Sequence, residues 1–98
     1  MMGPVQMVDK IAKHEEMGKE ELIRESLEAF LLGKKREYLK EKFELLSRHR
    51  VISAAELKKA IKEGKVTEHP SWEDLIDVRN IDAELKGIES DLKRLQKS

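Results

Sequence analysis

The residues of this 98-residue chain that could do chemistry are its three histidines, its serines and its many carboxylates. His14, His49 and His69 lie far apart in the sequence, and none has a spacing such as HxxxH or HExxH that binds a metal ion. No serine lies in the GxSxG motif of a hydrolase, and no cysteine is present to act as nucleophile or metal ligand. The glycines form no phosphate-binding loop. The sequence therefore predicts a protein that is not an enzyme and that uses neither a cofactor nor a metal ion.

One basic run, made of Lys34, Lys35 and Arg36, is the candidate for phosphate contact. The chain as a whole has 20 basic and 20 acidic side chains, so no general positive field attracts it to nucleic acid. We interpret the run as a solvated turn of helix that pairs with acids elsewhere in the chain. Phosphate contact is the alternative, and such a contact would not read base sequence.

The composition favours long amphipathic helices as the elements that carry these residues. Charged residues make up 41% of the chain and aromatic residues only 4%, which is typical of helical proteins. We therefore expect an all-α fold. A chain of this length with 39% hydrophobic residues buries only a modest core, which favours a homodimer.

The spacing of apolar residues predicts four helices within one domain, residues 1–98. Two are short, at 5–16 and 54–63, and two are long, at 19–48 and 72–96. Gly33 lies inside the first long helix, where one glycine permits a bend without ending the helix. The apolar face of this helix is expected to begin with Leu22, Ile23, Leu27, Phe30 and Leu31 and to continue with Tyr38, Leu39, Phe43, Leu45 and Leu46.

Local residue types mark where these helices begin and end. Gly18 is expected to end the first helix in the left-handed conformation that glycine accepts. Ser53 and Glu56 have the spacing of a capping box at the start of the third helix. Ser71 is expected to cap the last helix, with Asp74 at the third position after it.

The last helix carries the most regular pattern. Its apolar residues are spaced 3, 4, 3, 4 and 3 apart and form one narrow seam: Val78, Ile81, Leu85, Ile88, Leu92 and Leu95. This seam predicts a helical hairpin, in which the last helix packs antiparallel on the long second helix, or a coiled coil with a partner. Basic residues between 34 and 50 complement an acidic stretch at 63–91, which supports an antiparallel pair of helices within one chain or between two chains. At the start of the helix, Trp72, Leu75 and Ile76 are expected to be buried.

Residues 8–31, VDKIAKHEEMGKEELIRESLEAFL, resemble the helical part of the ribbon-helix-helix family. The resemblance implies that the chain associates with itself through five apolar residues: Ile11, Leu22, Ile23, Leu27 and Phe30. In that family paired N-terminal strands read DNA in the major groove. Here the preceding stretch MMGPVQM has a proline and no Lys or Arg, so no DNA-reading residue is carried over.

The order of the later segments, LEAFLLGKKREYLKEKFELLSRHR through WEDLIDVRNIDAEL, is similar to that of small archaeal helical antitoxins. That resemblance implies a protein that dimerises and binds a toxin protein through its C-terminal helices, as an amphipathic helix binds a groove.

The functional prediction is a non-enzymatic protein, a dimeric antitoxin or small regulator, that binds a partner protein through amphipathic helices. The alternative is a DNA-binding transcriptional regulator that uses the basic segment 34–50, and a helical scaffold subunit is a third interpretation. No signal peptide or membrane span is evident in the sequence, so a cytoplasmic location is expected.

Overall fold

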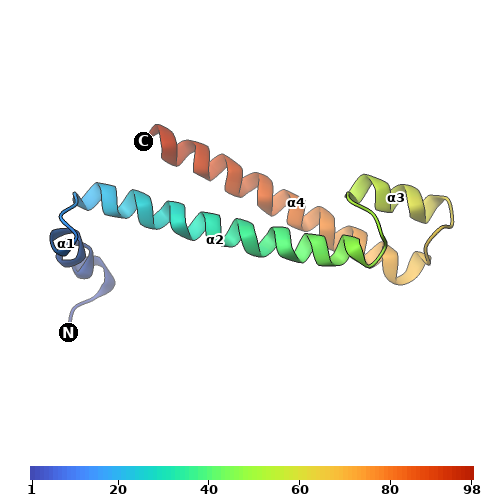
Figure 1. Cartoon of the computed structure of the whole chain (residues 1–98), viewed down its shortest axis with the longest axis horizontal. Helices are drawn as coiled ribbons and strands as arrows, with labels where there is room; N and C mark the ends of the chain where they lie inside the picture. Colours follow the sequence, from blue (N-terminus) through green and yellow to red (C-terminus); the bar gives the residue numbers. More distant parts are fainter.

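The computed structural model describes all residues 1–98 and contains four helices and no strand (Figure 1). The helices are α1, Pro4–His14; α2, Lys19–Ser47; α3, Ala54–Lys62; and α4, Glu68–Lys97. The predicted all-α fold class is confirmed. The helix α4 begins four residues earlier than expected, but His69 has extended backbone angles (φ −115°, ψ 124°), so the regular helix follows this residue.

The two long helices form an antiparallel hairpin, as predicted. In Figure 1, α4 runs back along α2, while α3 lies beside the start of α4 and α1 lies at the opposite end of α2. The molecule measures 60 × 31 × 16 Å along its principal axes. We call the end with α3 the closed end of the hairpin, and the end where the chain terminates beside the start of α2 the open end.

The hydrophobic core lies at the closed end. Six buried residues from three helices form it: Leu45, Leu46, Leu57, Leu75, Val78 and Ile81. Leu57, Leu75 and Val78 have no exposed surface. Because only 11 of 98 residues are buried in the whole chain, most of the hairpin has no core of its own.

The α4 seam becomes more exposed toward the open end. Val78, Ile81 and Ile88 are buried, whereas Leu85, Leu92 and Leu95 are only half-buried. Two ion pairs join the helices beside this seam: Lys42 Nζ lies 2.6 Å from Asp82 Oδ1, and Lys35 Nζ lies 2.5 Å from Glu89 Oε1. The expected pairing of basic α2 with acidic α4 is therefore present.

Three helix ends share one backbone motif, and it corrects the expectation for Gly18. Glu16, Arg50 and Gly64 all have positive φ, at 54°, 55° and 70°. At each, the next amide bonds five residues back, as when Met17 N–H donates to the Ala12 carbonyl over 2.9 Å. Glu16 therefore ends α1 in the left-handed conformation predicted for Gly18, and Gly18 is instead the extended N-cap residue of α2.

The capping prediction for α3 is confirmed with one change. Ser53 Oγ accepts a hydrogen bond from Glu56 N–H over 3.1 Å. The Glu56 carboxylate, however, accepts from the amide of Ile52 over 2.7 Å, one residue before the serine. At Gly33 the helix α2 continues without interruption.

At the start of α4 the expectations for Trp72 and Ile76 were wrong, because both side chains are nearly half exposed. They lie one turn apart on the outer face of the helix, whereas Leu75 and Val78 point into the core. The expected cap at Ser71 was also wrong, since neither Ser71 nor Asp74 caps the helix and both side chains contact His49.

Candidate interaction surfaces

A buried polar cluster joins the end of α2 to the start of α4. His49 Nε2–H donates to Asp74 Oδ2 over 2.7 Å, because a carboxylate only accepts, and Ser71 Oγ lies 3.4 Å from His49 Nδ1. Arg48 Nη1 lies 3.7 Å from the other oxygen of Asp74. No short sequence motif marks this cluster, because Ser71 and Asp74 lie 22 and 25 residues after His49.

The cluster has the residue types of a hydrolase triad, but its geometry presents no nucleophile. Ser71 is only 2% exposed, and its hydroxyl lines no pocket. Every buried polar side-chain atom has a hydrogen-bond partner. We interpret the cluster as a polar clamp that fixes the closed end. No group of three or more His, Asp or Glu side chains is arranged to hold a metal ion.

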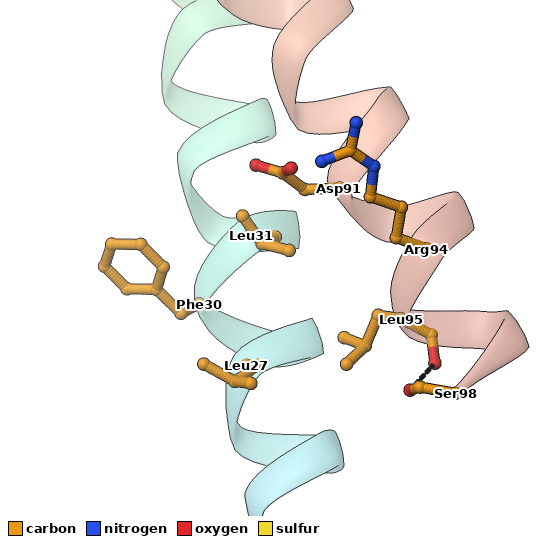
Figure 2. A pocket seen from close by; sticks show the side chains of 7 residues that line it. All are labelled: Leu27, Phe30, Leu31, Asp91, Arg94, Leu95 and Ser98. Atoms are coloured by element: carbon orange, nitrogen blue, oxygen red, sulfur yellow. Dashed lines mark hydrogen bonds between the residues drawn. The ribbon is translucent and has the colours of Figure 1, made fainter.

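The open end carries an apolar groove of about 460 Å³ between α2 and α4. Figure 2 shows Leu31 and Leu95 pointing into the space between the helices, whereas Phe30 points away from α4. Phe30 is 64% exposed and Leu27 about half exposed. Apolar side chains thus line the groove at this end without packing tightly against one another.

The residues expected to mediate self-association gather around this end. Ile11, Ile23, Leu27 and Phe30 are exposed, and Leu22 is half-buried against α1. Ile11, Leu22, Ile23 and Leu27 line a second groove of about 220 Å³ between α1 and α2. The structure brings these five residues to one end of the molecule and leaves four of them exposed.

Another apolar surface, separate from the two grooves at the open end, lies nearer the closed end and was not predicted. We call it the Phe43 groove: a hollow of about 290 Å³ lined by Leu39, Lys42, Phe43, Leu46, Val51 and Ile52. Phe43 is 72% exposed and Ile52 is 85% exposed, while buried Leu46 is also part of the lining. The sequence analysis assigned Leu39 and Phe43 to the same apolar face as Phe30.

That assignment was wrong because of the helical repeat. Nine residues separate Phe30 from Leu39, which is about two and a half turns, so the two side chains project from opposite sides of α2. The nine-residue spacing already places the two side chains on opposite sides of the helix. The change of side is easily overlooked because α2 is 29 residues long and apolar residues occur along all of it. The helix α2 therefore offers two apolar surfaces that point in different directions.

The candidate phosphate-binding run does not form one basic surface. Lys34 Nζ lies 3.5 Å from Glu37 and 5.5 Å from the centre of the Tyr38 ring, and Lys35 pairs with Glu89. Arg36 has no ion-pair partner. Consecutive helix residues project about 100° apart, so these three side chains diverge.

The geometry defines a class: an elongated α-helical hairpin with a small core and exposed apolar grooves. A family model covers residues 1–98, and the chain belongs to the Uncharacterized protein MJ0235 family. No curated protein and no solved structure matches the chain. None of the four helices is both long and apolar enough to cross a membrane.

Proposed function

We propose that this protein is a non-enzymatic interaction protein that forms a homodimer and binds a partner protein through its amphipathic helices. The observation that carries the proposal is the large surface that one chain leaves exposed. Its accessible area is 7724 Å². A compact monomer of 11.4 kDa is expected to expose only about 5,800 Å².

The excess area, about 2,000 Å² per chain, has the size of a permanent interface. Stable homodimers bury roughly 1,000–2,500 Å² on each subunit. The radius of gyration, 19.5 Å, also exceeds the value of about 13 Å expected for a compact chain of this length. Association with a second copy removes apolar surface from water that the single chain cannot cover.

We place the self-association surface at the open end, around Ile11, Ile23, Leu27 and Phe30. These side chains come from both α1 and α2, are exposed, and adjoin the apolar grooves at this end. Leu22 contributes from the wall of the groove between α1 and α2.

Sedimentation equilibrium over a concentration series tests the proposal. The unchanged protein should sediment as a dimer at micromolar concentration, and the double variant Ile23→Asp, Leu27→Asp should sediment as a monomer with unchanged helical circular dichroism. Trp72→Asp with Ile76→Asp is the matched control, because these exposed apolar residues lie on α4 at the closed end. A monomeric unchanged protein would refute self-association, and a dimeric Ile23, Leu27 variant would refute this location.

An antitoxin-type role is the particular form of this function that the sequence resemblance suggests. Its partner would be a toxin protein, and a bound protein identified as a ribonuclease or nucleotidyltransferase would support it. The alternative, DNA binding through residues 34–50, has less support, because Lys34, Lys35, Lys42 and Arg48 already pair with acids of the chain.

A further inference from the structure

We propose that the Phe43 groove binds an acidic amphipathic helix of a partner protein. This inference deepens the proposed function and rests on it, since it assigns partner binding to one surface and gives the partner's chemistry. Self-association is assigned to the open end, so the two surfaces can be tested separately.

The shape of the groove suits one side of a helix. Phe43 and Ile52 stand exposed on two different segments, α2 and the loop before α3, with Leu39 one turn before Phe43. Buried Leu46 and half-buried Val51 also line the hollow. Helices that bind in grooves insert apolar side chains spaced three, four and seven residues apart, and a short hollow between exposed apolar side chains accepts such residues.

The charge around the groove determines what the partner must carry. Arg36 and Lys40 lie one turn before Leu39 and Phe43 on the same side of α2, and Arg50 lies two residues before Ile52. These three basic residues are exposed and have no ion-pair partner. The remaining basic residue of the groove, Lys42, is already paired with Asp82.

The acids of this part of α2 lie on the side of the helix away from Leu39, although Glu37 and Glu44 lie one turn before and after Lys40. Glu37, Glu41 and Glu44 are spaced four and three residues apart, and helical geometry places them roughly opposite Leu39. Glu56 lies close to Ile52 and accepts a hydrogen bond from the Ile52 amide, but with Arg50 it lines the neighbouring hollow and not the Phe43 groove. A helix with apolar residues on one side and carboxylates at its margins therefore complements both the groove and its unpaired basic rim.

The apolar centre favours a protein helix over nucleic acid. Phosphates bound by Arg36, Lys40 and Arg50 would leave Phe43 and Ile52 exposed, whereas a helix covers them. A groove in which aromatic and aliphatic side chains are surrounded by polar residues is typical of protein interfaces.

The test uses a fluorescent synthetic peptide with leucines at i, i+4 and i+7 of a helix and glutamates on both flanks. A second peptide keeps the leucines and replaces the glutamates with lysines. Fluorescence anisotropy with the full-length protein should show the acidic peptide binding at least about tenfold more tightly than the lysine peptide, with the difference shrinking as salt is raised. Equal affinities would overturn the proposal.

Two phenylalanines on opposite sides of α2 make a matched pair of variants. Phe43→Asp should weaken acidic-peptide binding at least about tenfold and leave the dimer intact. Phe30→Asp should weaken the dimer and leave peptide binding unchanged. Failure of the dimer to form in the unchanged protein refutes the proposed self-association, whereas peptide binding that survives Phe43→Asp refutes the groove.

Charge reversal tests the rim. Arg36→Glu with Lys40→Glu should weaken acidic-peptide binding about tenfold, while Lys10→Glu with Lys13→Glu on α1 changes net charge equally at the far end of the molecule and should have little effect. Equal effects of the two double variants would overturn the rim assignment. Competition by a DNA duplex for the same site, or a loss of dimer mass in Phe43→Asp, would assign the groove to nucleic acid or to a second copy and overturn the proposal.

Discussion

The two ends of the α2–α4 hairpin differ in how completely their apolar residues are packed. At the closed end, α2, α3 and α4 together enclose Leu57, Leu75 and Val78, and the His49 clamp ties the helices beside this core. At the open end two helices face each other alone, and Leu27 lines a groove of about 460 Å³. The hydrogen bond that joins α2 to the end of α4 there is exposed: Arg24 Nη2 donates to the Ser98 carbonyl over 2.7 Å.

This difference separates the residues that hold the fold from those available for binding. Two helices that lie side by side bury only the side chains along their line of contact. A third helix is needed to cover apolar side chains on their other sides. The helix α3 supplies that cover at the closed end, whereas α1 packs mainly against α2 at the other end. Apolar side chains at the open end therefore contribute little to folding of one chain, and the self-association proposed above would account for their exposure.

The largest predicted effect comes from removing a core leucine at the closed end. Leu75→Ala should lower the free energy of unfolding by about 2–5 kcal/mol, because it leaves a cavity among fully buried neighbours. Leu27→Ala should lower it by less than about 1 kcal/mol in dilute protein, because that side chain is half exposed. Urea denaturation followed by circular dichroism measures both values.

Repeating these titrations at rising protein concentration sharpens the comparison. The loss caused by Leu75→Ala should stay constant, whereas the loss caused by Leu27→Ala should grow, since a dimer interface adds stability by mass action. A loss for Leu27→Ala that equals the Leu75→Ala loss in dilute protein would mean that the two ends are equally packed.

The sequence predicted the fold well where one physical rule acted alone. The seam of α4 keeps a strict apolar spacing, so both the helix and its hairpin face followed from the pattern. Helix ends were harder, because Glu16 and Arg50 adopt positive φ angles that residue type alone assigns to glycine. The amide of the residue that follows each of them donates a hydrogen bond to a carbonyl of the preceding helix. These hydrogen bonds offset the strain of the positive φ angle.

The candidate surfaces were harder to predict than the fold. Ser71 and Asp74 contact His49, which lies 22 and 25 residues away in the sequence and comes near them through the hairpin, so their spacing alone suggested a helix cap. The Phe43 groove needs Ile52 from a loop in addition to the helical stripe of Leu39 and Phe43. Such a surface joins residues through tertiary packing and has no periodic signature of its own.

A smaller effect is expected from the His49–Asp74 pair. His49→Ala should cost about 1–3 kcal/mol of unfolding free energy, because it leaves the buried Asp74 carboxylate without its closest donor. The double variant with Asp74→Ala should cost less than the sum of the two single variants by about 1 kcal/mol, as expected for groups in direct contact.

Urea titrations of the four proteins in this cycle give the coupling. Arg24→Ala, which removes the exposed tie at the open end, is the contrasting variant and should change stability by less than about 0.5 kcal/mol. A coupling within about 0.3 kcal/mol of zero would show that His49 and Asp74 do not act as a clamp.

The smallest effect concerns Glu89, on the exposed part of α4 that leads to the open end. Its pKa lies below the ordinary value for glutamate, because Lys35 donates a hydrogen bond to the carboxylate and attracts its charge, with a smaller attraction from Lys93. A lowered pKa in the folded state means that the pair stabilises the fold at pH values above the pKa of the unfolded chain. That contribution is lost as the pH falls through the lowered pKa of the folded protein.

A carboxyl NMR titration tests whether the helices remain in contact at this point. Lys35→Met should raise the Glu89 midpoint toward those of the other glutamates, whereas Lys34→Met should leave it unchanged, because Lys34 pairs with Glu37 on its own helix. Equal shifts in both variants would mean that the pKa of Glu89 reflects the positive charge of the 34–36 run as a whole. An ordinary midpoint in the unchanged protein would mean that α2 and α4 separate before Glu89, so that the open end extends further along the hairpin than the structure places it.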